Sequence, residues 1–155
     1  MHNVIDTFRF EHGFLSNFFP ATIEWEGIWY KSVEHAYQAS KTLDPDTRKM
    51  IASAPKPGVA KALGKCVELR NDWDSVKIDI MRKLIRLKFD SAVLAAMLVQ
   101  TGDAELIEGN TWNDTFWGVC RGQGANFLGQ ILMDEREFRK KQALEDEALM
   151  NKQQV

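Results

Sequence analysis

Residues 108–129, which read EGNTWNDTFWGVCRGQGANFLG, hold the densest group of side chains that could do chemistry. Two carboxylates, three asparagines, two tryptophans and five glycines fall within these 22 positions. Glu108 and Asp114 are candidates to act on a reacting centre, and Trp112 or Trp117 offers an indole ring on which a flat base could stack. A glycine-rich connection with buried tryptophans fits the same pattern equally well, although loops carry function more often than regular elements do.

The end of this segment also favours an anion. Gly122, Gly124 and Asn126 lead into a predicted helix N-terminus, where backbone N–H groups attract negative charge. The spacing is neither that of a Walker A loop nor that of a dinucleotide-binding glycine fingerprint, because no strand–turn–helix with the required glycines is present.

A second candidate group lies in the predicted helix SVEHAYQASK, residues 32–41. At about 100° per residue, Gln38 lies ~40° from Glu34, and Lys41 lies ~20° from it on the other side. The three polar groups therefore share one stripe. On spacing alone, a solvated face with ordinary i,i+4 contacts is the favoured interpretation. His35 is interpreted as a structural hydrogen-bonding residue, because no Ser or Cys nucleophile pattern accompanies it.

Two lysines and one asparagine complete the candidates. Lys77 and Lys88 flank an apolar line on a long predicted helix, where they either snorkel beside the core, the commoner arrangement, or hold a phosphate. Asn17 stands among aromatic residues in GFLSNFFP, residues 13–20, where it either bonds a ligand or satisfies the backbone of a turn.

The elements that must position these groups are mostly helices. Alternation predicts a strand over Thr7–Phe10, a hairpin with a turn at Glu26-Gly27, and a short strand within 106–110. Apolar periodicity and caps predict helices over about 32–42, 44–51, 59–63, 72–89 and 93–100, and from about 126 past 138. The sequence thus predicts a single compact α+β domain, mainly helical with a small sheet, over residues 1–140, and a charged tail or helix end over 141–155.

Composition narrows the class of protein. The chain has 155 residues, of which 45% are hydrophobic and 27% charged, so we expect one globular domain. Its net charge of −2 disfavours a generic basic nucleic-acid binder, although it does not exclude a local basic groove. The N-terminus lacks a secretory pattern, and no apolar run suits a membrane span, so we expect a cytoplasmic protein. Cys66 and Cys120 are interpreted as buried, reduced thiols. The few cysteines and histidines lack the spacing of a zinc site, so no metal is expected.

These segments together resemble the NADAR family, which is named for proposed links to NAD and ADP-ribose and includes YbiA-like N-glycosidases. The matching signatures are FLSNFFPA, SVEHAYQASK, DWDSVKIDIMRKLIRLKF, LIEGNTWNDTFWG and GANFLGQILMDER. They run in the family's order from Phe14 to Arg136, and their combination is highly specific.

The resemblance implies a compact, mainly helical α+β fold with one cleft, and hydrolysis of an N-glycosidic bond between ribose and a base-like nitrogen. It implies no metal, and we expect no cofactor. Two substrate classes are attributed to the family: phosphoribosylated pyrimidine intermediates of riboflavin synthesis, and ADP-ribose attached to guanine in nucleic acid. The expected partner is therefore a nucleotide-like small molecule or ADP-ribosylated guanine in nucleic acid, with no membrane.

The resemblance also implies that the polar stripe of Glu34, Gln38 and Lys41 faces the cleft rather than solvent. We expect Glu34 or Glu108 beside the sugar C1′, with Asp114 as the reserve carboxylate; the sequence does not rank them. Substrate-binding positions are expected at Asn17, Phe18, Gln38, Lys41, Lys77, Lys88, Trp112, Trp117, Gly118, Asn126 and Gly129. Among them, the lysines would hold phosphate, and Trp117, less clearly Trp112, would stack on the base. The ribose hydroxyls would be bound by Asn17 and Asn126.

A rival interpretation from another class is a non-catalytic module that binds ADP-ribose or nucleotides. The same pocket would serve, but the carboxylates would then be dispensable for affinity. Formation of product over time separates the two interpretations.

Overall fold

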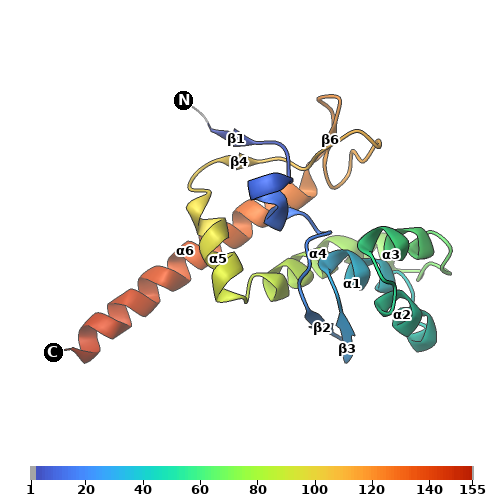
Figure 1. The fold of residues 1–155 in the computed structure, drawn as a ribbon, viewed down its shortest axis with the longest axis horizontal. Coiled ribbons are helices and arrows are strands. Elements are labelled where there is room, and N and C mark those ends of the chain that lie inside the picture. The colour runs from blue at the N-terminus through green and yellow to red at the C-terminus, as the bar shows by residue number, and fades with distance from the viewer. Residues whose placement is uncertain (1–2, 155) are drawn as a thin grey trace. The chain divides into compact units, whose positions relative to one another are not determined.

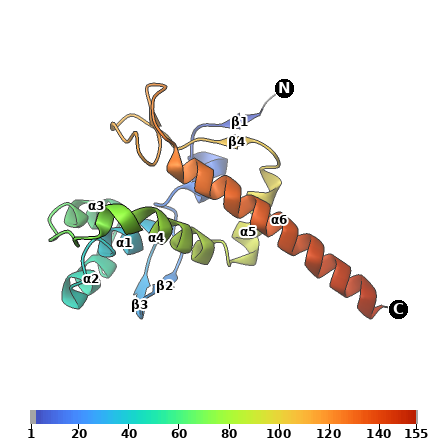
Figure 2. The ribbon, with the colours of Figure 1, turned by 180° about the vertical axis from the view of Figure 1, so that it is seen from behind.

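The computed structural model describes residues 3–154, and these divide into two compact units. We call Phe8–Asp90 the central unit, and residues 3–7 with 91–154 the terminal unit. The central unit holds a 3-10 helix and a hairpin followed by four α-helices, and the terminal unit holds two α-helices and two pairs of very short strands (Figures 1 and 2). The expected mixture of helices with little sheet is confirmed.

From the hairpin onwards, the elements of the central unit follow the predicted order. They are η1 (Phe10–Leu15), β2 (Ile23–Trp25), β3 (Ile28–Tyr30), α1 (Val33–Ala39), α2 (Pro45–Ala52), α3 (Pro57–Gly64) and α4 (Trp73–Lys88). β2 and β3 pair antiparallel around Glu26 and Gly27, which both have positive φ, as a two-residue hairpin turn requires.

The terminal unit joins the start of the chain to its end. β1 (Val4–Ile5) pairs in parallel with β4 (Glu105–Leu106), and β5 (Gly109–Asn110) pairs in parallel with β6 (Val119–Cys120). α5 (Ala92–Gln100) and the first turns of α6 (Phe127–Gln153) pack beside them. α6 stays helical through residues 141–153, all of which are exposed. No helix among residues 3–154 has the length and apolarity needed to cross a membrane.

Three expectations need correction. The strand predicted over Thr7–Phe10 is wrong, because Phe10 adopts a left-handed φ of 52° and starts η1, while the strand lies earlier at β1. The strand predicted within 106–110 is divided into β4 and β5, and Gly109 lies so close to the Asp6 carbonyl that no Cβ would fit. Cys66 is exposed rather than buried, although both cysteines are free as expected.

α1 is the most deeply enclosed helix of the central unit, since every residue from Val33 to Ala39 is buried. Its N-cap is Ser32, as the sequence predicts, and the Ser32 hydroxyl accepts a hydrogen bond from the His35 N–H at 3.2 Å. The same hydroxyl lies 2.7 Å from His35 Nδ1, and His35 Nε2 lies 3.0 Å from the Ala54 carbonyl oxygen. Because a carbonyl only accepts, Nε2 carries the proton, and Nδ1 accepts from Ser32.

This arrangement predicts a pH-dependent stability. Burial lowers the pKa of His35 below its ordinary 6.5, with a smaller lowering by the charge of Lys31 and an opposing effect of the Ala54 hydrogen bond. The unfolded state therefore binds the proton more tightly than the folded state does. We expect the free energy of unfolding to fall as the pH drops below ~6.5, by up to about 1.4 kcal/mol per pH unit. Denaturant titrations between neutral and mildly acidic pH measure this slope.

His35→Gln should flatten the slope, whereas His12→Gln, at a half-exposed position, should leave it unchanged. An equal slope in wild type and His35→Gln would contradict the assignment.

Candidate functional site

The centre of the first candidate group is a buried carboxylate on α1. Glu34 is 7% exposed and its Oε1 accepts a hydrogen bond of 2.8 Å from Gln38 Nε2, one turn further along the helix. The Glu34 backbone N–H donates to the Asn17 carbonyl at 3.1 Å, so the loop after η1 lies against the first turn of α1. The sequence places Glu34 and Gln38 on one stripe, and the structure encloses that stripe; a solvated face is therefore wrong for these two residues.

Two acceptor oxygens beside this carboxylate lack a partner among residues 3–154. Asn17 and Gln38 are 8% and 4% exposed, and each amide nitrogen is engaged, with Met81 Sδ at 3.6 Å and with Glu34 respectively. Neither Asn17 Oδ1 nor Gln38 Oε1 finds a hydrogen-bond donor in the described chain. Buried acceptors are nearly always satisfied in native proteins, so these two oxygens are exceptions to the usual pairing.

Lys41, just after α1, feels the charge of Glu34 and of three other lysines. Burial lowers the pKa of Lys41, the charge of Glu34 opposes that shift, and the charges of Lys61, Lys65 and Lys77 add to it. Three further ammonium groups thus lie within electrostatic reach of Lys41. Such clustering is unfavourable in the free protein and becomes favourable when an anion binds among the lysines.

Two of these lysines lie over aromatic rings. Lys41 Nζ lies 5.7 Å from the centroid of the Tyr37 ring, and Lys61 Nζ lies 5.9 Å from that of Phe18. Lys77 forms an ion pair with Asp74 at 3.0 Å, one turn before it on α4.

Lys88 is placed differently from the other lysines. It is 2% exposed, and its Nζ donates to the Ser16 carbonyl at 2.8 Å. Lys88 therefore anchors the loop that carries Asn17.

A close approach of α3 to α1 positions Gln38. Gly64, the last residue of α3, is buried, and a Cβ built on it would overlap the Gln38 side chain. Gly64 therefore keeps the Gln38 amide directed at Glu34. Gly58, near the start of the same helix, has no atom within 4 Å of a built Cβ.

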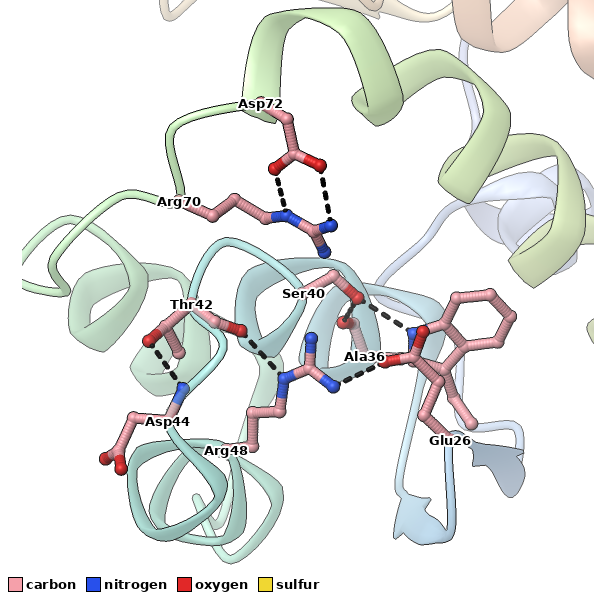
Figure 3. A network of polar contacts seen from close by, with 9 residues as sticks. Glu26, Ala36, Ser40, Thr42, Asp44, Arg48, Arg70 and Asp72 are labelled. Atoms are coloured by element: carbon pink, nitrogen blue, oxygen red, sulfur yellow. Dashed lines mark hydrogen bonds and ion pairs between the residues drawn. The ribbon is translucent and has the colours of Figure 1, made fainter.

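A network of polar contacts fixes α1 against the hairpin and α2 (Figure 3). Ser40 Oγ donates to the Ala36 carbonyl at 2.7 Å and accepts from Trp25 Nε1 at 3.0 Å. Arg48 of α2 donates from Nε to the Thr42 carbonyl at 2.8 Å and from Nη1 to Glu26 in the hairpin turn.

The start of α4 is held by a neighbouring pair. Arg70 binds Asp72 through two hydrogen bonds of 2.6 and 2.9 Å at the residue that precedes the helix (Figure 3).

The second candidate group belongs to the terminal unit, around Glu108. The Glu108 N–H donates to Asn126 Oδ1 at 3.0 Å, and Asn126 Nδ2 donates to the Leu106 carbonyl at 2.9 Å. Built Cβ atoms on Gly118 and Gly129 would overlap the carbonyls of Glu108 and Leu106 respectively. Gly118, Asn126 and Gly129 thus fix the backbone on both sides of Glu108, whose side chain is half-buried.

Asp114 and Asn110 organise the loop between β5 and β6. Asp114 Oδ1 accepts from the N–H groups of Phe116 at 3.1 Å and Trp117 at 2.9 Å. Asn110 Oδ1 accepts from the Asp114 N–H at 3.1 Å, while its Nδ2 donates to the Asp114 carbonyl at 2.8 Å. One Asp114 oxygen is thereby committed to the backbone that carries Trp117.

The two tryptophans of this loop differ in exposure. Trp112 is 49% exposed, whereas Trp117 is half-buried with its ring edge-to-face against Phe116, at 4.8 Å between centroids. Trp117 is the better held of the two rings, as a stacking platform requires.

The structure thus groups the expected site residues within each unit. Four of them lie together in the central unit: Asn17, Glu34, Gln38 and Lys41. Lys77 lies within electrostatic reach of Lys41, the ring of Phe18 contacts Lys61, and Lys88 anchors the loop that carries Asn17. In the terminal unit, Glu108, Asp114, Trp117, Gly118, Asn126 and Gly129 belong to one connected loop system, and Trp112 lies on its exposed part.

Sequence reasoning missed three residues. Lys61 and Lys65 are spaced i,i+4 on and just after a short predicted helix that ends near them, and this spacing is the signal that could have pointed to them. Asn110 bonds the loop on both sides, as asparagines in turns do. No group of three or more potential ligands for a metal ion occurs within residues 3–154.

Comparison with known proteins gives a consistent result. The family model described as the NADAR domain matches residues 6–138. The chain is 40% identical over 131 residues to N-glycosidase YbiA of Escherichia coli K12, covering 82% of this chain and 81% of that protein. It is 36% identical to the NMR structure of E. coli YbiA, with a TM-score of 0.83 over 94% of this chain and 90% of the other.

Two further relatives come from other bacteria. An N-glycosidase of Nostoc punctiforme is 41% identical over 133 residues, covering 81% of this chain and 85% of that protein. A protein of Vibrio vulnificus named as a riboflavin biosynthesis protein is 39% identical over 130 residues, which are 81% of this chain but only 35% of that protein.

The contact between α1 and α3 generates a matched pair of substitutions. Gly64→Ala places a methyl group where Gln38 lies, so we expect a loss of about 1–3 kcal/mol in the free energy of unfolding. Gly58→Ala meets no atom and reduces the entropy of the unfolded chain, so we expect no loss and up to about 1 kcal/mol of gain. Chemical denaturation of both variants measures the difference. Equal stabilities would show that Gln38 adjusts without strain.

Proposed function

The chain belongs to the NADAR family, and from this premise we propose that it hydrolyses the C1′–N bond between a phosphorylated ribose and a nucleobase-like group. Its relatives named N-glycosidase match it over four fifths of their length, and the chain is an N-glycosyl hydrolase of the same kind. The phosphorylated ribose is either phosphoribose or the ribose of an ADP-ribose group.

A single observation carries this proposal: two unpartnered acceptor oxygens lie beside a buried carboxylate. Asn17 Oδ1 and Gln38 Oε1 are suited to accept hydrogen bonds from ribose hydroxyls, which supply the missing donors. A ribose held in this way presents its C1′ to the group centred on Glu34.

The chemistry then needs negative charge near C1′. Cleavage of an N-glycosidic bond passes through a sugar with oxocarbenium character, and a carboxylate stabilises that charge and orients the attacking water. We place Glu34 first in this role, because its carboxylate is buried and positioned by Gln38. Glu108 is the alternative. Asp114 is third, because one of its oxygens already accepts two backbone N–H groups.

The lysine group supplies the phosphate site. Lys77, Lys61 and Lys65 lie within electrostatic reach of Lys41, which itself lies within electrostatic reach of Glu34. Lys88 contributes by anchoring Ser16, next to Asn17, rather than as a direct phosphate ligand.

Phe18 carries Lys61 on its ring. Within the terminal unit, Trp117 is the proposed ring for stacking on a base, with Trp112 as a second ring. Gly118, Asn126 and Gly129 shape the backbone around Glu108.

The substrate falls into one of two classes, phosphoribosylaminopyrimidine intermediates of riboflavin synthesis or ADP-ribosylated guanine. The name of the V. vulnificus relative supports the first class, and the family resemblance is compatible with both. Incubation with each substrate, with free base and free sugar phosphate measured over time, tests the proposal. Binding without product would favour a non-catalytic nucleotide-binding module. A cytoplasmic location is part of the same proposal.

The carboxylates provide the sharpest test of mechanism. Glu34→Gln keeps the shape and an oxygen that Gln38 can bond, but removes the charge, so we expect kcat to fall by about 10²–10⁴-fold. Affinity for the product should change much less, because the charge matters most in the transition state. Turnover and melting temperature are measured together for Glu34→Gln, Glu108→Gln and Asp114→Asn.

The Asp114→Asn variant is the internal control, because asparagine retains an acceptor oxygen for Phe116 and Trp117. It should keep its fold and most of its turnover. Wild-type turnover in all three folded variants would refute the carboxylate mechanism.

The lysines predict a dependence on phosphate. Lys41→Met should raise KM most for phosphorylated substrates, since one charge-assisted contact is lost. Because the pKa of Lys41 is lowered, phosphate affinity in the wild type should start to fall at a lower alkaline pH than an ordinary lysine would give, and Lys41→Arg should remove this fall.

Lys56→Met, an exposed lysine before α3, is the matched control and should leave KM unchanged. The phosphate role is excluded if Lys41→Met has the same KM as wild type on phosphorylated substrates.

A further inference from the structure

A hollow lies on the central unit, between the hairpin and the later turns of α4. It has a volume of about 420 Å³ and is lined by Trp25, Arg82, Lys83, Arg86 and Leu87. None of these residues belongs to the proposed catalytic or substrate-binding set. The volume is in the range of ligand sites, so the hollow is large enough for one flat ring with its substituents.

The charge around this hollow is positive. Arg82, Lys83 and Arg86 follow one face of α4, and all three are exposed. Lys83 pairs with Asp79 at 2.9 Å, but both side chains are more than half exposed, so an anion can replace this weak ion pair. Glu24 alternates away from Trp25 along β2.

Trp25 gives the hollow an aromatic wall that is held in place. Its Nε1 donates to Ser40 Oγ at 3.0 Å, and Ser40 is buried and bonded in turn to the Ala36 carbonyl. The indole therefore has a fixed orientation and loses little conformational freedom when a second ring stacks on it. Leu87 adds an apolar contact next to it.

We propose that this hollow binds one nucleotide unit of a single-stranded nucleic acid, with the base against Trp25 and the neighbouring phosphates on Arg82, Lys83 and Arg86. Fixed aromatic rings beside guanidinium groups are the combination that binds unpaired strands, because every base has a face that stacks and every step has a phosphate. The cations are exposed, which suits a strand passing over the surface; a free small molecule needs a more enclosing site. A net charge of −2 does not oppose a local contact of this kind.

The test uses the whole protein and a short, unmodified, fluorescently labelled single-stranded oligonucleotide. Arg82→Gln combined with Arg86→Gln should weaken binding about tenfold or more, and should reduce the slope of log affinity against log salt by about one per arginine. Trp25→Leu should weaken binding by a similar factor with the salt slope retained. Lys49→Gln combined with Lys56→Gln removes the same charge from exposed positions elsewhere in this unit and should leave binding unchanged.

Four results would overturn the proposal. In the first, the wild type does not bind the oligonucleotide; in the second, both double variants lose affinity equally. In the third, affinity is lost in Lys41→Met and not in the arginine variant. In the fourth, free AMP competes with the oligonucleotide at the same nucleotide concentration. Loss in Lys41→Met would assign the strand to the proposed active site. Hydrolysis of a small phosphoribosyl substrate, measured in parallel, should be unaffected by the arginine substitutions, so this inference and the proposed function can fail separately.

Discussion

The complete burial of α1 forces each of its polar side chains to find a partner inside the protein, and the central unit is organised around that requirement. His35 is satisfied by Ser32 and the Ala54 carbonyl, and Ser40 by Ala36 and Trp25. Glu34 and Gln38 bond each other, but the acceptor oxygen of the Gln38 amide has no partner among the described residues. Because unsatisfied buried groups are expensive, this retained polarity is what motivates the proposed role of the stripe in binding substrate.

In the terminal unit, side chains rather than long strands hold the backbone in place. Its strands are two residues long, so backbone pairing alone holds little of the 108–129 segment, and side-chain amides and one carboxylate take over. Asn126 bonds both strand-flanking residues Leu106 and Glu108, and Asn110 and Asp114 bond the loop that follows. Residue types that look catalytic in a sequence thus serve the backbone here, and the same bonds give Trp117 and Glu108 defined positions.

The sequence predicts the elements of this fold better than it predicts their environment. Ser32 as a cap and the Glu26-Gly27 turn follow from local chemistry, which a few neighbouring residues determine. α6 also begins next to Asn126 as predicted, but the Asn126 side chain caps no helix N–H and instead bonds Glu108 and Leu106. The burial of Glu34 and Gln38 does not, because an internal polar stripe and a solvated one have the same periodicity, and composition favours the solvated one. The lysines of α3 were missed for a similar reason: their importance comes from helices packed beside them. The family resemblance, and not the periodicity, indicated that this polar stripe does not face solvent.

The last turns of α6 have a further consequence. The first part of the helix buries residues such as Leu128, Ile131 and Leu132, whereas residues 141–153 are exposed at every position. A helical segment of this length gains little from its own hydrogen bonds in water and takes its order from the packed turns before it. Amide protons along α6 should therefore exchange with solvent on a gradient, slowly where the helix is packed and rapidly towards Gln153, so that one continuous helix spans two regimes of local stability.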